Sequence, residues 1–326
     1  MCTAVTYKTR DHYFGRNLDL EYSYKESVTI TPRNYVFKFR KMGDMQSHFA
    51  MIGMAYVVND YPLYYDATNE MGLSIAALNF PRNAVYNTFS DTMDNITPFE
   101  LVAWILGQCA TINETKKLLA QINILNENFS DEIPLSPLHW IISDKDSSIT
   151  LEAVKSGIKV YDNPVGVLTN NPTFDYQLFN LNNYMSLNNA DPQNTFLFNN
   201  DLNLEKYSRG MGAIGLPGDY SSVSRFVRAT FVKFNSVSSD TESESVSQFF
   251  HILKSVAMPR GCVKVANEQY AVTIYSSCCN TDLGIYYYTT YDNDCIFAVD
   301  MHKENLQSDT LIQYPLKTEN SIKYLN

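Results

Sequence analysis

The sequence predicts an α+β fold in which antiparallel sheets lie against separate layers of helices. Most of its 326 residues fall into short stretches that alternate apolar and polar residues, which is typical of strands. The segments with helical periodicity occur in two groups rather than between successive strands, which argues against repeated βαβ units. No linker or change in composition divides residues 1–326, so we expect a single domain.

The strand signals are concentrated at the two ends of the chain and in one central hairpin. The first part of the sequence predicts strands at residues 3–7, 12–16, 27–31, 35–39, 49–58 and 72–79. A hairpin is expected at residues 138–143 and 149–154, on either side of a polar turn. The last part predicts strands at residues 270–276, 284–289 and 295–299. Short connections of this kind pair neighbouring strands in antiparallel fashion.

Capping signals and apolar spacing locate four helices. Thr97-Pro98-Phe99-Glu100 and Thr111-Ile112-Asn113-Glu114 match the capping box and predict helices that end near residues 109 and 122. Apolar residues at helical spacing predict further helices over about 221–234 and 241–256. Residues 180–203 are rich in asparagine and lack periodicity, which indicates a long surface loop.

Composition and charge exclude several classes of partner. The chain has 25 Lys and Arg against 35 Asp and Glu, a net charge of −10, whereas a nucleic-acid partner requires a basic surface. No apolar run approaches the roughly 18–20 residues that span a bilayer, and no apolar segment of a signal peptide follows Met1. We therefore expect a cytoplasmic protein, without a membrane partner, whose six cysteines stay reduced.

Cys2 is the most informative single position. A small residue after Met1 permits removal of that methionine, and a thiol and a free α-amine then share one residue. An α-amine has a reference pKa of about 7.7–8.0, which suits a general base near neutral pH. A thiol with its own base is an activated nucleophile. The simpler alternative is that Cys2 begins an ordinary strand.

Five further polar residues are candidates for the same site. Arg16 and Asp19 follow the second predicted strand, where a guanidinium would favour thiolate and a carboxylate would hold the α-amine. Asn79 and Asn170 lie at strand ends shortly before a proline, where amide N–H groups can stabilise an oxyanion. Arg225 lies near the start of a helix, either as a solvated residue or as an anion contact. The alternative for Arg16 and Asp19 is a surface ion pair. The alternative for Asn79 and Asn170 is that each is an ordinary turn residue.

Motifs for cofactors and metals are weak. The segment Gly210-Met211-Gly212-Ala213-Ile214-Gly215 matches a dinucleotide-binding loop, but an asparagine-rich loop precedes it where a strand is required. The five histidines show no metal-ligand spacing. We therefore expect neither a cofactor nor a metal.

Taken together, these residues resemble the choloylglycine hydrolase family, and within it the conjugated bile salt hydrolases. The resemblance extends over essentially the whole chain. It is carried by short segments that occur in the family's order: Met1-Cys2-Thr3, Phe14-Gly15-Arg16-Asn17-Leu18-Asp19, Asp60-Tyr61-Pro62-Leu63-Tyr64, Asn69-Glu70-Met71-Gly72-Leu73, Leu78-Asn79-Phe80, Leu138-His139-Trp140, Val167-Leu168-Thr169-Asn170-Asn171-Pro172, Gly215-Leu216-Pro217-Gly218-Asp219, Ser224-Arg225-Phe226 and Gly284-Ile285-Tyr286-Tyr287-Tyr288.

The resemblance implies an N-terminal nucleophile hydrolase fold, an αββα sandwich of two antiparallel sheets between helical layers, assembled as a homotetramer. It implies that Cys2 is the nucleophile and that its freed amine is the base. Two oxyanion donors are implied, the side-chain amide of Asn170 and the backbone N–H of Asn79. Arg16 and Asp19 would tune and hold the nucleophile, and Arg225 would complete the polar site.

The implied reaction is hydrolysis of the amide bond that joins a steroid acid to glycine or taurine, by way of a thioester and without a cofactor. An apolar pocket fits the steroid part of such a substrate. The candidate lining residues are Leu18, Tyr24, Tyr61, Leu63, Ile133 and Leu138. Ser208-Arg209-Gly210 lies in a loop that the resemblance places near the site, where an arginine would favour the carboxylate of a glycine conjugate.

Two alternatives remain open at this level. A penicillin V acylase of the same family would share the nucleophile, although such acylases often resemble each other in carrying Tyr where this chain has Asn79. A non-catalytic protein that binds bile salts or other lipids would share the scaffold. Because all six catalytic positions match the family pattern, hydrolysis is the favoured interpretation.

Overall fold

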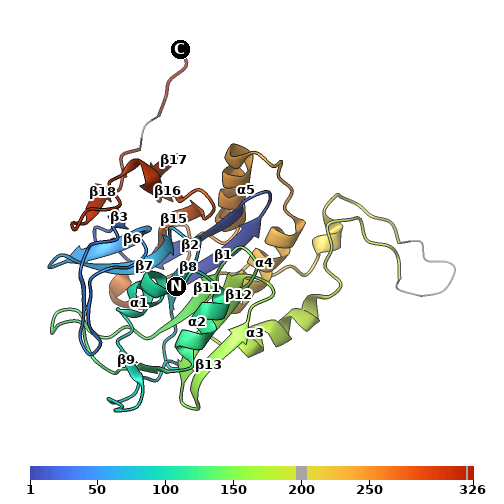
Figure 1. Ribbon diagram of the computed structural model, residues 1–326. Coiled ribbons are helices and arrows are strands. Elements are labelled where there is room, and N and C mark those ends of the chain that lie inside the picture. The colour runs from blue at the N-terminus through green and yellow to red at the C-terminus, as the bar shows by residue number, and fades with distance from the viewer. Residues whose placement is uncertain (196–203, 321) are drawn as a thin grey trace.

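The computed structural model describes residues 1–195, 204–320 and 322–326, and most of its strands belong to two large antiparallel sheets (Figure 1). Within the described residues, sheet A has six strands in the order β14-β1-β2-β15-β16-β17. These strands are β1 (Cys2–Lys8), β2 (His12–Leu20), β14 (Val167–Leu168), β15 (Val272–Asn280), β16 (Ile285–Thr290) and β17 (Asn293–Asp300).

Sheet B has eight strands in that same part of the chain, in the order β13-β12-β11-β8-β7-β6-β3-β18. They are β3 (Ser27–Thr31), β6 (Met51–Val58), β7 (Tyr61–Asn69), β8 (Ser74–Asn79), β11 (Leu138–Ser143), β12 (Ser148–Val154), β13 (Gly157–Asp162) and β18 (Ile312–Pro315). Two small ribbons flank the sheets and consist of β4 (Phe37–Phe39) with β5 (Gly43–Met45), and β9 (Asp94–Ile96) with β10 (Ile122–Ile124).

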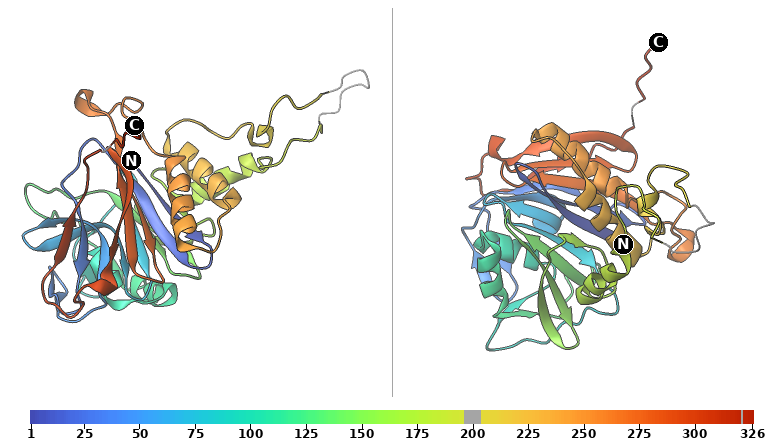
Figure 2. Two further views of the ribbon diagram at one scale, coloured as in Figure 1. Left: turned by 90° about the horizontal axis from the view of Figure 1, so that it is seen from above. Right: turned by 90° about the vertical axis from the view of Figure 1, so that its right-hand side faces the viewer.

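Helices cover the outer faces of the two sheets. Helices α4 (Ser222–Asn235) and α5 (Glu242–Lys254) pack on sheet A, and α1 (Leu101–Gln108) packs on β7 and β8 of sheet B. Figure 2 shows these two groups, with α2 (Ile112–Leu119) beside α1, on opposite sides of the sheets. The remaining helical segments are α3 (Phe174–Asn180), η1 (Leu181–Tyr184), η2 (Met211–Ala213), η3 (Ala266–Glu268) and η4 (Met301–Lys303). The layered arrangement confirms the predicted fold class.

Apolar side chains fill the space between the two sheets and the space between each sheet and its helices. The layer between the sheets includes Ala4 and Leu18 from sheet A and Leu78 from sheet B. A second layer between sheet B and the helices of its outer face includes Trp104 and Trp140. Central strands of sheet B are therefore buried on both faces, because successive side chains of a strand point to opposite sides.

The structure corrects the expected end of the second strand. We expected residues 15–19 to follow that strand, yet β2 runs on to Leu20. Strand β2 is held between β1 and β15, and both Leu18 and Asp19 pair with β15. Asp19 therefore lies within a central strand of sheet A.

Several elements had no counterpart among the expected ones, and they include the strands β5, β7, β9, β10, β13 and β18 and the helix α3. Strand β7 was not expected, because Pro62 and Asp66 break its apolar alternation, but it is paired on both sides. The helix α3 lies where no helix was expected. The loop expected at 180–203 begins with the short helix η1, and its residues 196–203 lie outside the described residues.

Helix starts agree only partly with the expected caps. Helix α1 begins at Leu101 rather than at Pro98. Half of the expected capping box forms, because the Glu100 carboxylate accepts the backbone N–H of Thr97 at 3.0 Å, but the Thr97 hydroxyl has no partner among the described residues. Helix α2 ends at Leu119 and has the expected cap from Thr111. Helix α4 begins after Ser221, whose hydroxyl accepts the N–H of Ser224 at 3.3 Å. This cap fixes the first turn of α4, which carries Arg225.

Candidate active site

Cys2 is the first residue of β1 and is buried at one end of the gap between the sheets. It pairs with Leu18 of β2, so its side chain shares the inner face of sheet A with Leu18. The Cys2 nitrogen donates to Oδ1 of Asn170 at 2.9 Å. While Met1 is attached, this nitrogen is an amide. Removal of Met1 converts it into an amine that already has a polar partner.

Arg16 lies on the same face of β2, two residues before Leu18, and is fully buried. Its Nη1 donates to the carbonyl oxygens of Tyr65 (2.9 Å) and Ala77, both in sheet B. Burial lowers the pKa of this guanidinium. The nearby Cys2 sulfur and the surrounding acidic groups raise the pKa by more, so the net result is a pKa above the ordinary value. Arg16 is therefore a permanent positive charge between the sheets.

A second carboxylate near Arg16, Asp66 of β7, was not expected from the sequence. It is fully buried, and it accepts hydrogen bonds from the hydroxyls of Tyr275 (2.7 Å), Tyr286 (2.6 Å) and Ser277 (3.2 Å). Burial raises its pKa, whereas the charge of Arg16 and the three hydroxyl donors lower it. A lone aspartate in an otherwise apolar strand was the only sequence signal for this residue.

Asp19 occupies the other face of sheet A, which the helices cover. The Thr273 hydroxyl donates to its Oδ1 at 2.6 Å, and its Oδ2 has no partner among the described residues. Its backbone joins the chain start, because its N–H donates to the Met1 carbonyl at 2.9 Å and its carbonyl accepts from the Met1 ammonium. Burial raises the pKa of the Asp19 carboxyl, and the charges of Arg225 and the N-terminus oppose that shift.

Arg225 is fully buried, which excludes the solvated position considered from the sequence. Its Nη1 donates to the Cys2 carbonyl and to the Thr3 hydroxyl (2.7 Å), and its Nη2 donates to Oδ1 of Asn170 at 2.7 Å. Its Nε donates to the Tyr220 carbonyl at 3.1 Å. Arg225 therefore fixes both the backbone of Cys2 and the side chain of Asn170.

Asn170 joins the two sheets at the site. It follows β14 of sheet A, and its Nδ2 donates to the carbonyl of Asn79, at the end of β8 in sheet B, at 2.7 Å. Its backbone N–H donates to the Ser222 hydroxyl at 2.8 Å. An amide NH₂ group has two hydrogens, so the second hydrogen of Nδ2 remains for another acceptor.

The direction of the Asn79 backbone N–H follows from strand register. Asn79 lies opposite Leu138 of β11, but the Leu138 N–H donates to the Tyr86 hydroxyl (2.7 Å) and not to Asn79. The neighbouring pair is the hydrogen-bonded one, because the N–H of Phe80 donates to the carbonyl of Pro137 (2.7 Å). Hydrogen-bonded and non-hydrogen-bonded pairs alternate in antiparallel sheets. The N–H of Asn79 therefore points away from β11, to the side on which its carbonyl meets Asn170.

Of the six candidate pocket residues, Leu18 lies beside Cys2, whereas Tyr61 and Leu138 pack against the apolar layer between sheet B and its helices. Leu18 is buried beside Cys2 in β2, whereas Tyr24 is 43% exposed in the loop after β2. The remaining four are partly buried and come from β7, the 131–137 loop and the start of β11; they are Tyr61, Leu63, Ile133 and Leu138. None of the six lines the cavity described next.

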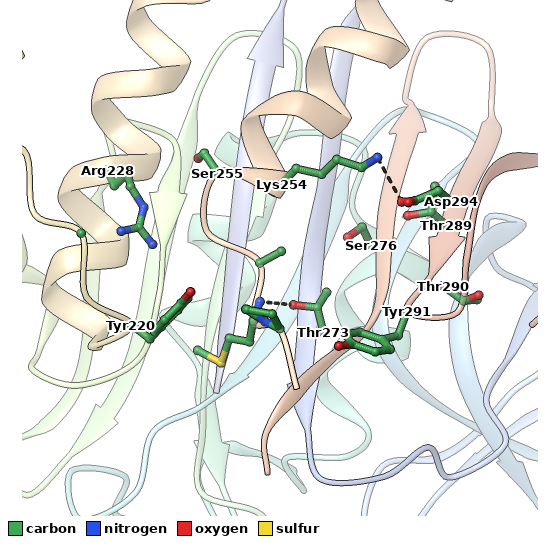
Figure 3. A pocket seen from close by; sticks show the side chains of 14 residues that line it. Tyr220, Arg228, Lys254, Ser255, Thr273, Ser276, Thr289, Thr290, Tyr291 and Asp294 are labelled. Carbon is green, nitrogen blue, oxygen red and sulfur yellow. Dashed lines mark hydrogen bonds and ion pairs between the residues drawn. The ribbon is translucent and has the colours of Figure 1, made fainter. Parts of the chain in front are cut away.

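A cavity of about 570 Å³ lies on the helix-covered side of sheet A (Figure 3). Arg228 and Tyr220 come from the α4 side, Lys254 lies at the end of α5, and Thr273 belongs to β15. Thr273 lines this cavity, and its hydroxyl donates to the Asp19 carboxylate. The cavity therefore lies next to the hydrogen bond that holds the Asp19 side chain. Its walls present both polar and apolar surface, and the Lys254 ammonium forms an ion pair with Asp294 at 3.0 Å.

The arrangement brings a buried thiol, a chain-start nitrogen, two guanidinium groups and two amide donors to one end of the gap between the sheets. Such a set can form and resolve a covalent acyl intermediate. No helix in the described part of the chain is long and apolar enough to cross a membrane.

Comparison with known proteins shows close relatives over the full length of the chain. The family model described as "linear amide C–N hydrolases, choloylglycine hydrolase family" matches residues 2–314. The bile salt hydrolase/transferase of Lactiplantibacillus plantarum is 57% identical over 319 residues, which cover 98% of each chain. The protein of the same name from Clostridium perfringens is 39% identical over 336 residues, which cover 100% of each chain.

Solved structures give the same result. A crystal structure of a variant of the conjugated bile acid hydrolase from Clostridium perfringens matches with a TM-score of 0.91 at 37% identity and covers 100% of both chains. The structure of a penicillin V acylase from Agrobacterium tumefaciens matches with a TM-score of 0.74 at 18% identity, covering 99% of this chain and 100% of the other. The second match shows a shared fold.

Proposed function

Because the chain belongs to the choloylglycine hydrolase family of linear amide C–N hydrolases, we propose that it hydrolyses the amide bond of glycine- or taurine-conjugated bile salts. The full-length relatives named as bile salt hydrolases support this substrate class. The observation that carries the proposal is the contact of the Cys2 nitrogen and the Arg225 guanidinium with the same oxygen of Asn170. This contact holds the chain start where a nucleophile and its base are needed.

The proposed reaction begins after removal of Met1. The Cys2 α-amine takes the thiol proton, and the thiolate attacks the amide carbon to form a carbon–sulfur bond. The resulting ammonium donates a proton to the leaving nitrogen as the carbon–nitrogen bond breaks, and glycine or taurine departs. Water then hydrolyses the thioester and releases the bile acid. Because nucleophile and base share one residue, little orientation entropy is lost.

The surrounding groups have separate roles in this proposal. Arg16 supplies a permanent positive charge that favours the thiolate of Cys2. Asp19 and Arg225 hold the chain start from the helix-covered side, through backbone contacts and charge. The second hydrogen of Asn170 Nδ2 and the N–H of Asn79 stabilise the oxyanion of the tetrahedral intermediate.

The steroid part of the substrate requires an apolar surface beside this polar site. We place it against the residues expected from the sequence, namely Leu18, Tyr24, Tyr61, Leu63, Ile133 and Leu138. The position of Leu18 beside Cys2 on the inner face of sheet A supports the assignment. Arg209 is exposed and would favour the carboxylate of glycine conjugates. If Arg209→Ala leaves the ratio of kcat/KM for glycocholate and taurocholate unchanged, that preference has another origin.

We also propose a cytoplasmic homotetramer. Free thiols are kept reduced in the cytoplasm, and all six cysteines are free in the structure. The segments next to residues 196–203 extend away from the sheets (Figure 2) and carry large apolar side chains with 63–83% exposure. These side chains are Tyr176, Phe179, Met185, Tyr207 and Ile214. Such exposure is typical of a subunit contact, and light scattering after size exclusion would give the mass of the assembly.

The test of the proposed function compares the wild type with Cys2→Ala. We expect the wild type to release glycine from glycocholate and Cys2→Ala to show no turnover. The intact mass of the active protein should be lower than the full sequence by one methionine. Much faster hydrolysis of penicillin V than of glycocholate would reassign the substrate, and binding of bile salts without turnover would make the protein a carrier.

A further inference from the structure

The two proposed oxyanion donors belong to different sheets. Asn79 ends β8 of sheet B, and Asn170 follows β14 at the edge of sheet A. No strand ladder connects β8 with β14 in the described residues. The spacing of the two donors therefore depends on side chains that cross the gap between the sheets.

His139 crosses this gap next to both donors. It lies in β11 of sheet B and is fully buried. Its Nε2 lies 2.9 Å from the carbonyl of Thr169, the residue before Asn170. Its ring also stacks on Phe80, the residue after Asn79, with centroids 4.1 Å apart and planes inclined by 7°. One imidazole thus contacts the chain beside each oxyanion donor.

Glu152 of β12 holds the ring in this orientation. Its Oε1 lies 3.1 Å from Nδ1 of His139, and both side chains are fully buried. The same oxygen accepts the backbone N–H of Phe174 at 3.0 Å, at the start of α3. Because a carbonyl can only accept, Nε2 carries the proton that is donated to Thr169. The two ring nitrogens have partners on opposite sides, so the ring cannot turn without breaking both contacts.

We propose that His139, held by Glu152, is a positioning residue that sets the spacing of Asn79 and Asn170 across the gap between the sheets. This inference rests on the proposed function, since it assigns the two amides to one oxyanion. The hydrogen bonds of the His139 ring go to Glu152 and Thr169 rather than to Cys2, so its loss should spare the nucleophile. Misplacement of a catalytic group by about 1 Å can cost about a hundredfold in rate.

The test uses substitutions that remove the contacts of His139. His139→Leu and Glu152→Leu each remove the contact between His139 Nδ1 and Glu152 Oε1. We expect both variants to lose about tenfold to a hundredfold in kcat for glycocholate, with KM changed less than about twofold. Alkylation of Cys2 by iodoacetamide should proceed at the wild-type rate in both.

His12→Gln is the matched control, because His12 is also buried and hydrogen-bonded, at the far end of β2 from the site. We expect its kcat to equal that of the wild type at neutral pH. Equal losses in His12→Gln and His139→Leu, or a parallel loss of Cys2 alkylation, would overturn the proposal in favour of a general effect on the fold.

A crystal structure of His139→Leu separates this proposal from the proposed function. We expect the 2.7 Å hydrogen bond from Asn170 Nδ2 to the Asn79 carbonyl to be lost in the variant. If that bond is retained, His139 does not set the spacing, whatever the kinetics. If the wild type hydrolyses no conjugated bile salt, the proposed function fails, and the measured distance still decides the positioning role.

Discussion

Replacing Asn170 by Asp isolates the donor role of this side chain from its other contacts. Oδ1 accepts from the Cys2 nitrogen at 2.9 Å and from Arg225 at 2.7 Å, whereas Nδ2 donates to the Asn79 carbonyl at 2.7 Å. Asp has the same shape and keeps both acceptor contacts. It replaces the donor by an oxygen that faces the Asn79 carbonyl, so that hydrogen bond and the oxyanion contact are lost together.

The size of the effect follows from the number of donors. One donor is removed while the N–H of Asn79 remains, and loss of a single oxyanion donor costs about 10²–10³ in kcat, or about 2.7–4 kcal/mol. The lost tie to Asn79 adds to this cost, because the two sheets lose a contact at the site. The new carboxylate lies beside Arg225, which compensates its charge and preserves the fold. We therefore expect kcat to fall at least about a hundredfold.

The assay follows glycine release from glycocholate, with iodoacetamide alkylation of Cys2 as a measure of the intact nucleophile. Asn171→Asp is the matched control, since Asn171 Nδ2 also donates across the gap, to the Pro81 carbonyl at 2.7 Å, without contact to Cys2. We expect Asn171→Asp to keep near-wild-type kcat. The reasoning is refuted if Asn170→Asp stays within about tenfold of the wild type, or if both variants lose equally.

Three further predictions concern buried charges. Burial lowers the pKa of His12 from 6.5 to about 4, so on acidification the unfolded chain binds a proton before the folded protein does. The free energy of unfolding should therefore fall by about 3 kcal/mol as the pH drops from 6.5 to 4. Equilibrium unfolding of His12→Gln should lack this fall. Burial lowers the pKa of Lys233 from 10.5 to about 8, so between these values the unfolded chain binds more protons than the folded protein. The free energy of unfolding should therefore rise from pH 8 to 10. A Lys233→Met protein that shows the same rise in urea titrations would contradict this. Asp66→Asn removes an anion that shares Arg16 with Cys2, so alkylation of Cys2 at pH 6 should become severalfold faster; an unchanged rate would show that Asp66 does not act on the thiol.

The strand and helix pattern was readable from the sequence where pairing is local. The hairpin of β11 and β12 forms as expected, because its turn and its apolar alternation act between neighbours. The cap of α4 by Ser221 was equally local, and it places Arg225 in the first turn. Strand β7 was not predicted, because Pro62 and Asp66 interrupt its apolar alternation. Its strand conformation is stabilised by pairing with β6 and β8, which the local sequence does not reveal.

The candidate site could be assembled only partly from the sequence. The resemblance pointed to all six polar residues. The structure places Arg16, Asn79 and Asn170 with Cys2 at one end of the gap between the sheets, and Asp19 and Arg225 on the helix-covered side of sheet A. It also adds two groups for which the sequence predicted no role in the site. Asp66 lies between the sheets near Arg16, and the His139–Glu152 pair contacts the segments of both proposed oxyanion donors. These contacts join residues far apart in the chain, which spacing alone does not reveal.

The sequence by itself determined the class of fold, the position of the nucleophile candidate at the chain start and the family to which the chain belongs. Those properties depend on residue type, on periodicity and on order along the chain. Only the tertiary structure decided that Arg16 and Arg225 are buried rather than solvated, and that donors from two sheets face one cysteine. Burial and the spacing between sheets arise from the packing of distant segments, and this packing decides which charges are desolvated and which amides meet.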